Sequence, residues 1–163
     1  MLAQNIAFGI VAALMVVAAL KVVTTQNVVH AALYLVIVLA GVAAIYILLA
    51  AEFTAITQVI VYIGAVIVLF LFGIMLTRAP IGRTADLDND QRWIAALVAL
   101  PLLGVLGWTL QDAFGDTEIE FGRVQRTADV GTAIFRDFVI PFEVVSVLLL
   151  AALVGAVVIA RRD

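Results

Sequence analysis

Residues 51–78 read AEFTAITQVIVYIGAVIVLFLFGIMLTR, and the uncharged part of this stretch, residues 53–77, decides the fold. Its 25 residues would form a helix about 37 Å long, which crosses the hydrocarbon core of a bilayer with some tilt. Glu52 and Arg78 place a charge at each end. The stretch therefore predicts a membrane-spanning helix.

The polar residues Thr54, Gln58 and Tyr62 follow one another at α-helical spacing, with Ala65 next on the same face and Thr57 beside them. The rest of the helix is mainly Val, Ile, Leu and Phe. A polar face on a spanning helix turns toward protein or water rather than lipid. We therefore expect this helix to be the central one of a larger membrane assembly.

The composition of the whole chain agrees with a membrane protein. Of its 163 residues, 66% are hydrophobic and 13% charged, whereas soluble domains are closer to half and a quarter. The net charge of -3 is too small to indicate a partner, and no nucleic acid is expected. With no cysteine and one histidine, this chain cannot supply a cysteine-ligated iron–sulfur cluster, a thiolate metal site or a haem held by two histidines.

Four further apolar runs are long enough to span a membrane: residues 2–20, 28–51, 93–111 and 139–160. The sequence thus predicts an all-α integral membrane protein, residues 1–163 forming a single membrane domain of five transmembrane helices. Asn27 is the expected N-cap of the second helix, and Glu52 marks a tight turn before the third. Residues 78–91 and 111–137 are expected outside the membrane.

The distribution of Lys and Arg predicts the orientation. With the N-terminus outside and the C-terminus inside, the inner side holds six of the nine: Lys21, Arg78, Arg83, Arg92, Arg161 and Arg162. The outer side holds the other three: Arg123, Arg126 and Arg136. Because cytoplasmic loops carry the excess of positive residues, we expect the N-terminus outside.

Small residues predict where helices pack closely in lipid. The last helix has Ala151-xxx-Gly155 and Ala152-xxx-Ala156-xxx-Ala160, and the second has Ala40-xxx-Ala44. Such patterns also arise by chance in alanine-rich helices. Only the stripe of the last helix is taken as a packing prediction.

Few residues offer chemistry. Tyr62 is either a hydrogen-bond anchor between helices or part of a proton or water path. Gly64 and Gly73 indicate either close packing or a local defect such as a π-bulge. Glu143, two residues after Pro141, is expected in the first turn of the last helix, as an interfacial structural acid or, if deeper, a functional group. Self-contained catalysis is not expected.

Three segments resemble a known family, subunit J of bacterial NADH–quinone oxidoreductase (complex I). Residues 51–76 resemble its signature segment, and the run VIVYIGAVIVLFLF carries most of the likeness. NVVHAALYL, residues 27–35, resembles the family's N-P-V-H start of the second helix, with Val28 in place of proline. IPFEVVSVLLL, residues 140–150, resembles its last helix.

The resemblance implies a membrane-arm subunit that binds no cofactor itself, in a complex that carries FMN, iron–sulfur clusters and quinone. Its implied partners are the lipid bilayer and the other membrane subunits: the quinone-site subunit, small three-helix subunits and antiporter-like subunits. The implied location is a bacterial inner membrane.

The resemblance also implies that the third helix switches between a π-bulge and an α-helix and so gates a water or proton path. Carried onto this chain, the switch segment is residues 62–68. The implied coupling residues are Tyr62, Gly64, Ala65, Val68 and Glu143. Gln58 stands where some members of the family have an acid, which weighs against a proton-carrying role there.

Two other hypotheses remain open from the residues alone. The chain could be a purely structural subunit, in which Tyr62 and Gly64 only pack. It could also be an independent small transporter or channel, although the single polar stripe and the lack of an internal repeat weigh against this.

Overall fold

A computed structural model describes residues 2–77, 91–116 and 126–161. Five helices are long and apolar enough to cross a membrane: Leu2–Thr24, Val28–Leu48, Glu52–Leu76, Trp93–Phe114 and Val139–Ala160. The predicted class, an all-α integral membrane protein with five spans, is confirmed. The predicted loop 78–91 lies almost wholly outside the described residues, as do Arg83, Arg123 and Arg162.

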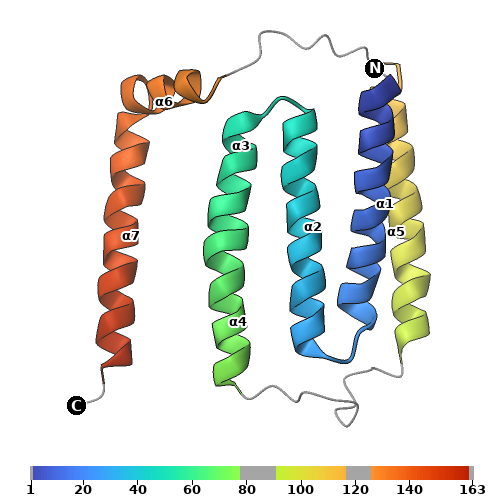
Figure 1. The fold of residues 1–163 in the computed structure, drawn as a ribbon, viewed down its shortest axis with the longest axis horizontal. Coiled ribbons are helices and arrows are strands. Elements are labelled where there is room, and N and C mark those ends of the chain that lie inside the picture. Colours follow the sequence, from blue (N-terminus) through green and yellow to red (C-terminus); the bar gives the residue numbers. More distant parts are fainter. Residues whose placement is uncertain (1, 78–90, 117–125, 162–163) are drawn as a thin grey trace.

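Helices α1 (Leu2–Thr24) and α2 (Val28–Leu48) form an antiparallel pair joined by a short turn (Figure 1). Their contact uses small residues, because Ala18 of α1 and Ala32 and Gly41 of α2 are buried. A Cβ atom on Gly41 would overlap the side chain of Met15. Close approach of this kind is how helices associate in lipid, where there is no hydrophobic drive between them.

The polar ends of this pair are satisfied locally. Asn27 caps α2, its side chain accepting hydrogen bonds from the backbone N–H groups of Val29 at 2.9 Å and His30 at 3.3 Å. The predicted N-cap is therefore confirmed. At the other end, Gln4 Nε2 of α1 donates to the carbonyl oxygen of Leu48 at 2.8 Å, which satisfies one of the last carbonyls of α2.

The turn after α2 is a Schellman motif with an unusual residue at its centre. Ala50 has φ 56°, in the left-handed region where glycine is the usual choice. Its N–H donates to Ile47 O at 3.0 Å, and that of Ala51 donates to Tyr46 O at 2.9 Å. This motif turns the chain within three residues, so the next span runs antiparallel beside α2.

The third span consists of three helical segments with no break in the chain: α3 (Glu52–Thr57), η1 (Gln58–Val66) and α4 (Ile67–Leu76). η1 is a π-helix. α2 packs against all three segments and, on its other side, against α1. The first three spans therefore form one packed unit with α2 in the middle (Figure 1).

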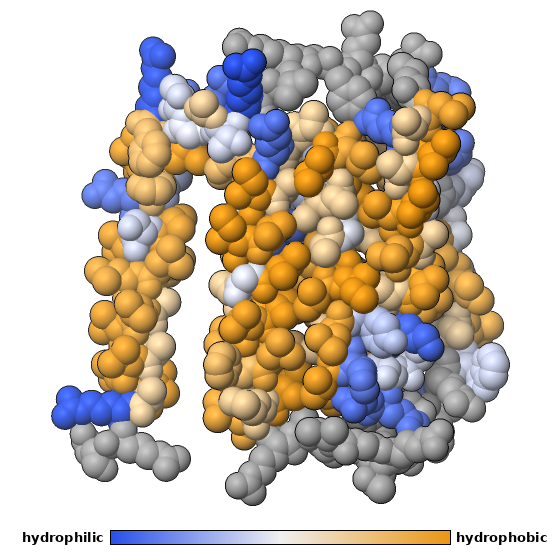
Figure 2. Space-filling model, in the orientation of Figure 1, coloured by the Kyte–Doolittle hydropathy of each residue, from blue (hydrophilic) through white to orange (hydrophobic). Residues whose placement is uncertain are grey.

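The last two spans stand apart from this unit. α5 (Arg92–Phe114) packs against no other helix among the described residues. α7 (Val139–Ala160) contacts only α6 (Thr127–Arg136) within the same part of the chain. α6 lies across the end of α7, and the gap between α7 and α4 is open in Figures 1 and 2.

Two features differ from the sequence-based expectations. α6 is a helix within the stretch expected only to be extramembranous, and it links α7 to α3. The small-residue stripe of α7 packs against none of the described helices, whereas Gly41 and Ala43 of α2 are buried. Whether the stripe of α7 packs against a helix of another chain stays a prediction, because residue spacing does not name the neighbour.

Candidate functional site

The candidate site is the π-helical segment η1, Gln58–Val66, in the middle of the third span. At its end the N–H of Ile67 donates to the carbonyl of Tyr62, five residues earlier rather than four. π-helical turns are rare and are frequently found at functional sites. The predicted π-bulge is confirmed as a structural feature. It begins four residues before the segment 62–68 that the resemblance implied.

The five-residue spacing changes which residues of the span face α2. Ala55, Gln58 and Ile67 are buried, and between Gln58 and Ile67 only Ile63 is not exposed. Successive residues on the buried side, at positions 55, 58, 63 and 67, are therefore three, five and four residues apart. A regular α-helix would place residue 62 there, because seven residues after Ala55 complete two turns. In η1 the neighbouring Ile63 takes that place.

This spacing corrects the predicted polar face. Only Gln58 of that set is buried, at 7% exposed, while Tyr62 is 48% exposed. Thr54 and Ala65 are also exposed within this chain. The prediction assumed 3.6 residues per turn throughout, and the π-helical turn shifts Tyr62 away from Gln58.

The other predicted residues of this span lie on the outer side of η1 and α4. Gly64, Ala65 and Val68 are all exposed within this chain. A Cβ atom on Gly64 would meet only the carbonyl oxygen of Val59, at 3.5 Å, which is ordinary van der Waals contact. The backbone at Gly64 is therefore not crowded by its own chain.

Gln58 has an unusual environment for an amide. Thr57 beside it is satisfied, its hydroxyl donating to Phe53 O at 2.8 Å. The Gln58 side chain has no hydrogen-bond partner among the described residues. Buried polar side chains are normally hydrogen-bonded, so Gln58 stands out among the described residues. Sequence analysis placed it on the polar face but not among the coupling residues.

Glu143 lies on a different helix from the rest of the predicted set. It is the fifth residue of α7, which begins at Val139, so it lies beyond the first turn where it was expected. It lines a shallow hollow of about 300 Å³ with Ile140, Val144 and Val147. Because α7 does not pack against η1 in the described part of the chain, the structure does not bring Glu143 together with Tyr62 and Gly64.

Glu52 begins α3, where the helix N-terminus favours a carboxylate. It lines an apolar hollow with Ile47, Ile56 and Val59. The described residues contain no group of three or more His, Asp or Glu side chains placed to hold a metal. The site so defined is a non-α-helical turn inside a membrane span with one buried amide. A protein with five apolar spans and a site of this kind belongs to the class of multi-pass membrane proteins.

Comparison with known proteins identifies the family within that class. Residues 18–159 match the family described as NADH-ubiquinone/plastoquinone oxidoreductase chain 6. The chain belongs to this family.

Its relatives include proteins of several kinds of organism. NAD(P)H-quinone oxidoreductase chain 6 of Leptolyngbya boryana is 39% identical, over 98% of this chain and 81% of the relative. F(420)H(2) dehydrogenase subunit J of Methanosarcina mazei is 37% identical, over 98% and 92%. The chloroplastic NAD(P)H-quinone oxidoreductase subunit 6 of Chlorokybus atmophyticus is 36% identical, over 90% and 78%.

Proposed function

We propose that this chain is a membrane subunit of a respiratory quinone oxidoreductase complex, in which it helps to couple quinone reduction to proton translocation. Family membership supports the place in a complex, since the relatives are named as chains or subunits of such enzymes. Two of these relatives are named for different electron donors, NAD(P)H and F420H2, yet their sequence identities to this chain are nearly equal, 39% and 37%. The donor is therefore a property of other subunits in this proposal.

The redox groups likewise belong to the partners. The sequence has no cysteine to ligate an iron–sulfur cluster. FMN, iron–sulfur clusters and quinone are assigned to neighbouring subunits, and this chain contributes helices in the lipid bilayer. The proposed neighbours are the quinone-site subunit, small three-helix subunits and antiporter-like subunits. The bacterial inner membrane is the proposed location.

The observation that carries the coupling role is η1. Conversion of this segment to a regular α-helix would remove the five-residue step. Residues beyond η1 would then rotate by about 100°, one residue's worth of α-helical turn, relative to those before it. Tyr62 would replace Ile63 on the side where Ala55 and Gln58 are buried.

This rotation exchanges an alkyl side chain for a phenol beside the buried amide. A phenol donates and accepts hydrogen bonds, whereas isoleucine does neither. The α-helical form would thus place Gln58 and Tyr62 on one polar face, and the π-helical form separates them. We propose that the two forms connect and break a water path past the third span.

Gly64 makes this conversion easier. Glycine disfavours a regular α-helix by about 1 kcal/mol relative to alanine. Its missing side chain also leaves room for the backbone to change register. Ala65 and Val68 follow on the part of the span that would rotate. Glu143 is assigned to the same path as a group on α7, reached through partner subunits rather than directly.

The test measures proton pumping and quinone reduction in the assembled complex. Tyr62→Phe removes the hydroxyl, and Gly64→Val adds a β-branched side chain that stiffens the helix. Both variants should assemble and should lower the number of protons pumped per quinone reduced. Met75→Leu, near the far end of the same span and outside the proposed coupling residues, serves as a conservative control. Full pumping in both variants, or failure of both to assemble, would overturn the coupling role.

A further inference from the structure

Gln58 is a buried amide whose hydrogen-bonding capacity this chain does not use. Its backbone N–H is already bonded within the helix, to Ala55 O and Thr54 O. Its side chain is 7% exposed and has no partner among the described residues. A carboxamide has two N–H donors and one carbonyl acceptor, so all of these require a partner from elsewhere.

The buried residues near Gln58 offer methyl groups rather than polar atoms. Ala55 lies three positions earlier on the same helix and is 4% exposed. Ala43, also 4% exposed, is five residues before the end of α2, and Gln58 is six residues after the start of α3. In an antiparallel hairpin these distances place Ala43 and Gln58 at similar depth. Two small buried side chains therefore lie at the level of the amide.

The amide is covered but not sealed. Among the described residues, every side-chain nitrogen or oxygen that is closed to a water-sized sphere has a hydrogen-bond partner. The Gln58 amide atoms are unpaired, so they remain within reach of a molecule of that size.

We propose that the Gln58 carboxamide binds an ordered water molecule between α2 and η1. Water fits the requirement because it is small and can both accept from Nε2 and donate to Oε1. Backbone carbonyl oxygens of the π-helical segment have second lone pairs to accept its remaining hydrogen bond. Water that inserts into the helical hydrogen-bond ladder is a recognised companion of helix irregularities.

This water site goes beyond the proposed coupling role and stands without it. It rests on the burial and missing partners of Gln58, not on any change in η1. A site of this kind would hold its water even in a purely structural subunit. The test therefore uses density rather than activity as its main result.

The experiment is a cryo-electron microscopy map of the chain in the assembly in which it purifies from its own membrane, at a resolution that shows ordered water. The expected result is a density peak within hydrogen-bond distance of the Gln58 amide, about 2.7–3.2 Å. Gln58→Met keeps the length of the side chain and removes its polar atoms, so the peak should be lost. Thr57→Val should keep the peak, because the Thr57 hydroxyl is already bonded to Phe53 O.

Two results would overturn the site. The first is a wild-type map in which the Gln58 amide bonds directly to a group of another chain and no water peak is present. The second is a peak that persists unchanged in Gln58→Met. The wild-type map decides the matter alone if that variant does not assemble. Pumping measured on Tyr62 and Gly64 variants tests the coupling role separately.

Discussion

At the residue scale, Ala50 is the position where the backbone is strained. Its φ of 56° lies in the left-handed region, which costs an L-residue with a Cβ atom roughly 1–2 kcal/mol. The Schellman hydrogen bonds of Ala50 and Ala51 hold it there. The tight antiparallel turn between α2 and α3 depends on this residue.

Replacing Ala50 by glycine should stabilise the turn. We expect Ala50→Gly to raise the free energy of unfolding by up to about 1 kcal/mol, because relief of the strain exceeds the entropy cost of glycine. The neighbouring Ala51 has an ordinary φ of -94°, so Ala51→Gly should give no gain. Thermal unfolding of the purified assembly measures both. Equal effects of the two variants would contradict the strain at Ala50.

At the scale of the element, the backbone at the start of α2 can accommodate a proline at position 28. Asn27 has extended backbone angles, φ -97° and ψ 112°, which are those that a following proline requires. Val28 is the first helical residue, and its N–H is one of those a helix leaves unpaired. The resemblance in the sequence pointed to the same position, since the related family has proline there.

Val28→Pro should therefore stabilise the second span, by about 0.4–1 kcal/mol. Val29→Pro is the matched control, because it removes the N–H that donates to Asn27 Oδ1 at 2.9 Å. It should destabilise by about 1 kcal/mol. The two variants are compared by thermal unfolding of the purified assembly. A loss of stability in Val28→Pro equal to that in Val29→Pro would contradict the cap geometry.

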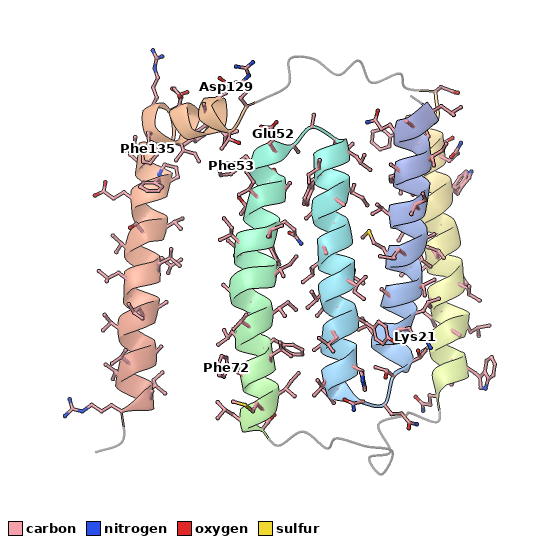
Figure 3. The ribbon with its side chains drawn as sticks, in the orientation of Figure 1. Lys21, Glu52, Phe53, Phe72, Asp129 and Phe135 are labelled. Atoms are coloured by element: carbon pink, nitrogen blue, oxygen red, sulfur yellow. The ribbon has the colours of Figure 1, made fainter. Side chains whose placement is uncertain are left out.

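At the same scale, α6 explains how α7 keeps its place near the third span. The rings of Phe135 and Phe142 meet edge to face with centroids 5.1 Å apart, so α6 is attached to the start of α7. Asp129 accepts a hydrogen bond from the backbone N–H of Arg126 and so closes the first turn of α6. Figure 3 shows Asp129 and Glu52 near the ends of α6 and α3 that face each other. A surface helix therefore links two spans that do not pack directly.

At the scale of the whole molecule, the start of α1 and the end of α7 lie at opposite ends of the helices (Figure 1), as five spans require. Which end faces the cytoplasm stays a prediction from the Lys and Arg distribution. α6 lies at the same end as the start of α1, and the turn between α1 and α2 lies at the other.

Cysteine labelling tests this orientation, since the natural sequence has no cysteine to interfere. Thr127 of α6 and Gln26 of the first turn are both exposed. Thr127→Cys should react with a membrane-impermeant maleimide in intact cells, and Gln26→Cys only after the membrane is opened. The physical reason is the excess of positive residues on the inner side. The reverse pattern would place the N-terminus inside.

The described helices leave much apolar surface that this chain does not cover. α5 has no packing partner among the described helices, and α7 has only α6. Figure 2 shows apolar residues over both sides of the gap beside α7. Van der Waals packing between helices, which stabilises proteins in lipid, is therefore absent over much of the described surface.

The sequence by itself determined the five spans and the cap at Asn27, whereas the irregular turn in the third helix was implied only by the family resemblance. The first two features depend on local properties: apolar length and a side chain that reaches its own backbone. Hydrophobic length decides a span without reference to any neighbour.

Only the tertiary structure decided which residues face inward. The π-helical step put Ile63 rather than Tyr62 on the buried side and left Gln58 as the one buried amide among the described residues. It also showed that α2, not α7, uses its small residues within this chain. The physical reason is that facing depends on the hydrogen-bond period of the backbone and on the helix packed beside it, and neither is visible in residue spacing alone.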